Sequence, residues 1–148
     1  MSRLDDVAAT DGWLCWICDE PVDPTMSVND ARGPSIDSCI TKAKAKAKGG
    51  GELERLAHRG CNSKKGAVAV VIAWPRELFV ADPAPIMASV ERLSRKGGRE
   101  IMARCPTLVD AEHAAEWLRG RVQRLRPDLL TSTSVEAGGG QFMVVLRA

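Results

Sequence analysis

The chain of 148 residues and 16.0 kDa suits one compact domain or a small domain with an appendage, and it is too short for a large multidomain enzyme. Its 45% hydrophobic and 27% charged residues are typical of a globular protein and exclude a disordered or fibrous chain. The net charge of +2 conceals an uneven distribution, because residues 1–38 contain two basic and eight acidic side chains, whereas residues 39–66 contain eight basic and two acidic ones. This basic block favours a polyanionic partner such as nucleic acid, and a solvated charged face is the alternative.

No segment of the sequence is suited to a membrane. The longest apolar run, residues 67–74, is far shorter than the roughly 20 residues that span a bilayer. Asp5 and Asp6 occupy the stretch where a secretory signal would be apolar. We therefore expect a cytoplasmic protein.

The first half of the chain reads as small strands and loops. Short polar segments rich in turn residues extend over the first 75 residues, and a helix is expected after Cys61. Prolines at position 75 and across 82–85 then interrupt the chain. This punctuation predicts a first domain over residues 1–75 and a second segment over residues 84–148.

The second half has clearer periodicity. Apolar residues at helical spacing, closed by two glycines at 97–98, predict a helix over 84–96. A longer helix is predicted from Asp110, a plausible N-cap, to just before Pro127. Its apolar stripe is formed by Ala111, Ala114, Leu118, Val122 and Leu125.

Two strands are predicted to close the chain. Residues 129–135 and 141–146 are rich in β-branched or large apolar side chains, and three glycines lie between them, which indicates a terminal hairpin. The fold class expected for the whole chain is therefore α+β. The strand, helix and hairpin pattern of the second segment also suits dimerisation or binding of a protein partner.

The chemistry is concentrated in two matched pairs of residues. Cys15 and Cys18 are separated by two residues, and His58 and Cys61 repeat that gap. Four such ligands can hold one tetrahedral Zn²⁺ ion, and an odd total of five cysteines suits a metal site better than a disulfide framework. The alternatives are buried cysteines that act as small apolar residues beside a surface histidine, or a redox pair, which would need a strand before it and a helix after it.

A family resemblance appears in the stretch that follows. The sequence Pro-Ser-Ile-Asp at 34–37, three glycines at 49–51 and Leu-Ala-His-Arg-Gly-Cys-Asn-Ser-Lys-Lys-Gly at 56–66 resemble an HNH endonuclease. The resemblance covers about the first half of the chain. It implies the ββα-metal (His-Me finger) fold, with Cys15, Cys18, His58 and Cys61 holding structural zinc. It also implies that Asp37 and Asn62 ligate a catalytic Mg²⁺ or Mn²⁺ ion, and it suits a bacteriophage or mobile-element protein acting on DNA.

The sequence departs from the family pattern at the general base. Where the family has a histidine after the strand aspartate, this chain has Ser38. A serine hydroxyl cannot accept a proton near neutral pH, and loss of a positioned base typically costs about 10²- to 10⁴-fold in rate. The residue that usually braces the hairpin is replaced by Leu53. We therefore expect phosphodiester cleavage to be impaired or absent.

A run of alternating lysines is the most obvious candidate for contacting DNA. In either an extended or a helical form it would present several positive charges to phosphates, and a mobile solvated loop is the alternative. The predicted nucleic-acid-binding residues are Lys42, Lys44, Lys46, Lys48, Arg59, Lys64 and Lys65. The competing hypothesis for the whole chain is a non-catalytic zinc scaffold that binds or regulates a protein partner.

Overall fold

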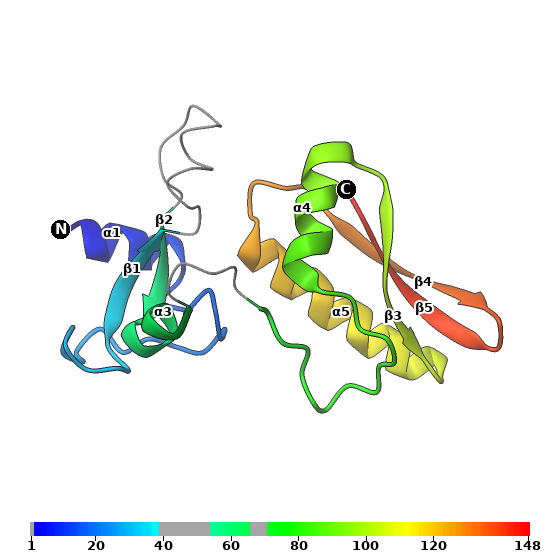
Figure 1. Ribbon diagram of the computed structural model, residues 1–148, viewed down its shortest axis with the longest axis horizontal. Coiled ribbons are helices and arrows are strands. Elements are labelled where there is room, and N and C mark those ends of the chain that lie inside the picture. Colours follow the sequence, from blue (N-terminus) through cyan, green and yellow to red (C-terminus); the bar gives the residue numbers. More distant parts are fainter. Residues whose placement is uncertain (1, 39–53, 66–70) are drawn as a thin grey trace. The chain divides into compact units, whose positions relative to one another are not determined.

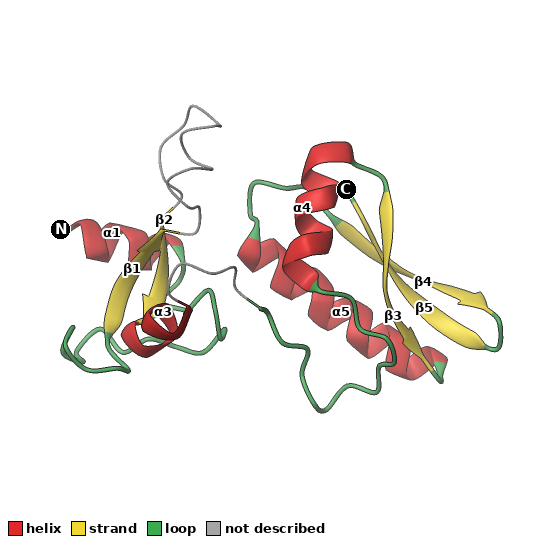
Figure 2. Cartoon of the chain, viewed as in Figure 1, coloured by secondary structure: helices red, strands yellow, loops and turns green. Residues whose placement is uncertain are grey.

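The computed structural model describes residues 2–38, 54–65 and 71–148 of the chain (Figure 1). The chain divides into two compact units, Met1–Val70 and Val71–Ala148. The described part mixes helices with two small antiparallel sheets and ends in a β-hairpin (Figure 2), so the predicted α+β class is confirmed. None of the helices in this part is both long and apolar enough to cross a membrane.

The first unit begins with a capped helix that the sequence analysis did not predict. Helix α1 spans Arg3–Thr10, and Ser2 and Asp5 form a reciprocal capping box that satisfies free backbone donors at its start. Asp11 follows as the C-cap. Ala8 is the only residue of α1 that is buried. The helix contacts β1 and β2 and leaves most of its side chains at least partly exposed.

An antiparallel strand pair and a short helix follow in the described part of the first unit. Strand β1 spans Pro34–Ser38, strand β2 spans Glu54–His58, and Pro34 pairs with His58. Helix α3, Arg59–Lys65, follows β2 without a break and lies beside both strands (Figure 1). It therefore begins two residues before Cys61, the residue after which a helix was expected.

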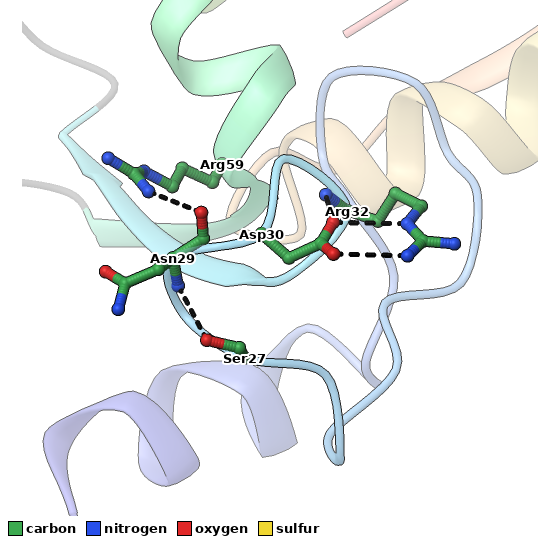
Figure 3. Close-up of polar contacts among 5 residues, drawn as sticks. All are labelled: Ser27, Asn29, Asp30, Arg32 and Arg59. Carbon is green, nitrogen blue, oxygen red and sulfur yellow. Dashed lines mark hydrogen bonds and ion pairs between the residues drawn. The ribbon is translucent and has the colours of Figure 1, made fainter.

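The loop before β1 approaches the start of α3 closely (Figure 3). The backbone N–H of Arg59 donates to Gly33 O at 2.9 Å, and that of Gly60 donates to Ala31 O at 2.7 Å. A Cβ at Gly33 would lie 1.9 Å from the carbonyl oxygen of Ser27, a contact that no side chain can make. Glycine at position 33 is therefore a requirement of this packing.

The second unit packs two helices on a three-stranded sheet. Helix α4 spans Ile86–Lys96 and contacts β3, Arg99–Cys105. Helix α5 spans Leu108–Leu125 and contacts all three strands, including β4, Ser132–Gly138, and β5, Gln141–Arg147. The strand order is β3-β5-β4, with antiparallel pairing throughout.

The core of this unit follows the predicted apolar patterns. The α5 stripe is buried at all five predicted positions, and so are Ile86, Val90 and Leu93 of α4. Val144, Val145 and Leu146 of β5, a strand that α5 contacts, are also fully buried.

Several predicted boundaries in the second unit were wrong: α4 begins at Ile86 and not at 84, and β4 ends at Gly138 and not at 135. The N-cap of α5 is Thr107 and not Asp110, because the Thr107 side chain accepts the Asp110 backbone N–H at 3.1 Å. Strand β4 begins three residues later than predicted, since the tight turn fixes the register by pairing Gly138 with Gln141. Gly139 and Gly140 both have positive φ, as a two-residue hairpin turn of this type requires.

Candidate metal centre

The two predicted ligand pairs meet in the first unit. The ligand atoms of Cys15, Cys18, His58 and Cys61 all lie within 4.8 Å of one another. Nδ1 of His58 lies 3.3 Å from the Cys18 sulfur and 3.8 Å from the Cys61 sulfur. Tetrahedral zinc with thiolate and imidazole ligands separates neighbouring ligand atoms by roughly 3.5–3.8 Å. This cluster of three cysteines and one histidine can therefore hold a zinc ion.

The first pair sits on a tight turn just after α1. The Cys15 backbone N–H donates to Glu20 O at 2.9 Å, and the Asp19 N–H donates back to Cys15 O at 2.8 Å. Asp19 adopts a positive φ of 65°, which closes the turn. The turn buries Cys15 completely and brings Cys18 to the surface.

The second pair sits where β2 becomes α3. His58 is the last residue of the strand and Cys61 lies in the first turn of the helix, so the change of backbone direction brings both side chains toward the same point. Nε2 of His58 donates to Pro21 O at 2.9 Å. A proton held on Nε2 leaves the lone pair on Nδ1, the nitrogen that faces the cysteines.

The thiols depend on a cation to lose their protons. Burial raises the pKa of Cys61 to about 12, and the neighbouring Cys15 and Cys18 add to this shift. Burial is also the main cause of the raised pKa of Cys18. Without a bound cation these thiols stay protonated at neutral pH, and a metal ion supplies the positive charge that stabilises the thiolates.

The residues predicted to hold a catalytic metal lie where β1 meets α3. Asp37 is buried; its Oδ2 accepts from Trp16 Nε1 at 2.9 Å, and its Oδ1 accepts from Lys65 Nζ at 3.0 Å. Asn62 donates its Nδ2 to Ser35 Oγ at 3.0 Å and to Ile36 O at 3.4 Å. Ser38 is the last residue of β1 and pairs with Glu54 through the backbone.

The predicted nucleic-acid-binding residues differ in their exposure, and four of them are not described by the structure. Lys64 is exposed in the last turn of α3, and Arg59, also exposed, donates its Nη1 to Asn29 O at 2.7 Å (Figure 3). Lys65 is largely buried against Asp37. The other four, Lys42, Lys44, Lys46 and Lys48, lie outside the residues that the structure describes, and so does Leu53.

A second buried ion pair, which was not predicted, supports the strands. Arg55 Nε donates to both carboxylate oxygens of Asp11, at 2.9 and 3.1 Å, and both side chains are less than a tenth exposed. Asp11 Oδ2 also accepts the backbone N–H of Leu56 at 2.7 Å. The partners are 44 residues apart in the chain, so no local spacing could have paired them.

Comparison with known proteins identified no relative. No protein-family model matches the chain, and neither the curated proteins nor the solved structures provide a match.

Proposed function

We propose that the first unit is a zinc-stabilised DNA-binding domain of the HNH type, which cleaves phosphodiester bonds poorly or not at all. The observation that supports this most strongly is that Cys15 and Cys18 meet His58 and Cys61 at the junction of β2 and α3. In the described part of this unit, β1, β2 and α3 follow α1. Three sulfur ligands and one nitrogen ligand favour zinc over the oxygen-seeking Mg²⁺ and Ca²⁺. Zinc would replace the large apolar core that a unit of this size lacks.

The charge of the same unit supports a polyanionic ligand. Its basic block, residues 39–66, carries eight lysines and arginines, and the exposed side chains of Arg59 and Lys64 belong to it. Contacts of this kind neutralise phosphates and carry little sequence information, so we expect binding that depends on salt and not on base sequence.

Weak or absent cleavage is supported by the residue at position 38. The histidine that activates water in HNH enzymes is replaced by Ser38, which cannot act as a base near neutral pH. A divalent ion beside Asp37 would polarise the phosphate and activate water. Without the base, we expect at most slow turnover.

DNA binding is tested by fluorescence anisotropy of zinc-loaded full chain on labelled duplex, branched and single-stranded DNA at several salt concentrations. We expect binding at low salt that weakens steeply as salt rises. Reversing Lys42, Lys44, Lys46 and Lys48 to glutamate should abolish it. A control with the same change in net charge reverses four exposed residues of the second unit, Arg76, Arg95, Lys96 and Arg119, and should weaken binding much less.

Cleavage is tested on supercoiled DNA with Mg²⁺ or Mn²⁺. We expect the parent chain to be silent or slow. Cleavage by the parent chain that is lost in Asp37→Ala would contradict the impaired-nuclease proposal. A chain that retains zinc and binds none of the DNAs at low salt would contradict the DNA-binding proposal and favour the alternative, a zinc scaffold for a protein partner.

A further inference from the structure

The resemblance to HNH enzymes implies a divalent metal at Asp37, and the surroundings of Asp37 do not fit one. The residue is 4% exposed, and each carboxylate oxygen already accepts a hydrogen bond, one from Trp16 and one from the ammonium group of Lys65. A Mg²⁺ ion binds carboxylate oxygens at roughly 2.0–2.1 Å and needs an octahedral shell. Such an ion would have to displace Lys65 Nζ.

We propose that Lys65 takes the place of that cation, neutralising Asp37 and keeping divalent metal ions away from its carboxylate. This inference rests on the proposed function and extends it, because it makes the first unit a DNA-binding domain that needs only its zinc ion. Lys65 is 11% exposed at its side chain, so its charge acts on Asp37 with little screening by solvent.

Among the residues that the structure describes, the charges paired around Asp37 leave no excess negative charge for a second metal. Its cross-strand partner is Arg55, which is itself paired with Asp11. The two buried carboxylates are thus matched by two buried cations within contact distance. A divalent ion added to this neutral cluster would be a buried and uncompensated charge, which is strongly unfavourable.

Lys65 lies on the same helix as Cys61, one of the proposed zinc ligands. Helix α3 starts directly after His58 and contains Cys61. Midway along it, Asn62 donates its amide group to Ser35 Oγ and Ile36 O of β1, whereas a metal ligand would present its Oδ1 to the ion. Helix α3 therefore delivers the Lys65 ammonium group to Asp37 at 3.0 Å.

The test measures Mn²⁺ binding by electron paramagnetic resonance, using full chain already saturated with zinc so that the cysteine cluster is occupied. Lys65→Met removes the charge and keeps the length of the side chain. Lys64→Met is the matched control, since Lys64 is its exposed neighbour on the same helix. We expect Lys65→Met to bind Mn²⁺ at least tenfold more tightly than wild type and Lys64→Met to behave as wild type. Adding Asp37→Asn to Lys65→Met should remove the gain.

Two results would overturn the inference: wild type that already binds Mn²⁺ through Asp37, or Lys65→Met that gains no binding. Should Lys65→Met fail to fold, wild type is compared with Asp37→Asn. Equal Mn²⁺ binding by these two supports the inference, and a loss of binding in Asp37→Asn contradicts it. None of these readouts uses DNA, so failure of the DNA-binding proposal is detected separately.

Discussion

The imidazole of His58 donates its Nε2 proton to the carbonyl oxygen of Pro21 at 2.9 Å, which directs Nδ1 toward Cys18 and Cys61. Pro21 pairs with Leu14, so this hydrogen bond also connects the two sides of the cysteine turn to the end of β2. Partners of this kind set the tautomer and orientation of histidine ligands in metal sites. The hydrogen bond to Pro21 thus gives His58 the tautomer and direction that a zinc ligand needs.

Substituting one of the zinc-binding cysteines should release the metal ion and unfold the first unit. Cys18→Ser or Cys61→Ser is expected to lose most of the bound zinc, because the remaining three ligands hold the ion weakly and the unit has few other buried contacts. Zinc content and thermal unfolding check this. Cys105→Ala is the control, since Cys105 is buried in the second unit and should leave zinc content unchanged. Full zinc occupancy in Cys61→Ser would contradict the assignment.

The buried Asp11–Arg55 pair should contribute far more to the free energy of unfolding than the exposed Arg3–Glu54 pair. Arg55→Met leaves a buried carboxylate without its cation, and we expect a loss of about 3–5 kcal/mol in the free energy of unfolding. Arg3→Met breaks the exposed pair with Glu54 and should cost less than about 1 kcal/mol. Urea unfolding of the zinc-loaded chain measures both. Equal losses would show that Asp11 is not buried as the structure has it.

Replacing Gly33 and replacing Gly120 by alanine should change protein stability in opposite directions. Gly33→Ala forces a Cβ against the Ser27 carbonyl, and the loop that supports the start of α3 must then move. We expect clear destabilisation of the first unit. Gly120→Ala, within α5, meets only the flexible end of Arg124, and it should stabilise the second unit by roughly 0.5–1 kcal/mol through helix propensity. Thermal unfolding that moves in the same direction for both would be inconsistent with these contacts.

The carboxyl of Asp30 should titrate well below its usual range. The side chain of Arg32 is the main cause, and its backbone N–H adds to the effect, lowering the pKa of Asp30 to about 2 (Figure 3). Because this value lies below the ordinary 3.8, the contact favours the fold above that pH and is lost as the pH falls toward 2. An NMR titration should give this low midpoint and a higher one in Arg32→Gln. An unchanged midpoint in Arg32→Gln would contradict the contact.

The metal cluster could be predicted from the sequence because its ligands come as two short pairs. Each pair shares a local turn, and only the meeting of the two turns requires the fold. The α5 helix of the second unit was predictable for a similar reason, since its apolar stripe repeats at the helical period and is buried throughout. Strand β3, Arg99–Cys105, was not predicted. The N-cap of α5 was predicted wrongly because it depends on a single hydrogen bond. The start of β4 was predicted wrongly because it depends on strand register.

The polar network behind the cluster could not be predicted. Asp37 and Lys65 are 28 residues apart, and Trp16 and Asp37 are 21 apart, so their contacts exist only after β1, α3 and the cysteine turn have packed. Asp37 was assigned to a metal on the basis of a motif, and Lys65 to DNA on the basis of its charge. Each residue considered separately is consistent with those roles, and the ion pair between them is a property of the packed structure.

The proposed zinc site is tested by X-ray absorption at the zinc edge, together with metal analysis. Both are carried out on protein purified without added metal chelators. We predict one zinc ion per chain with three sulfur ligands and one nitrogen ligand, at about 2.3 Å and 2.0–2.1 Å. His58→Ala should lose the nitrogen signal. A chain that takes up no zinc, or zinc bound mainly by oxygen, would contradict the metal centre formed by Cys15, Cys18, His58 and Cys61.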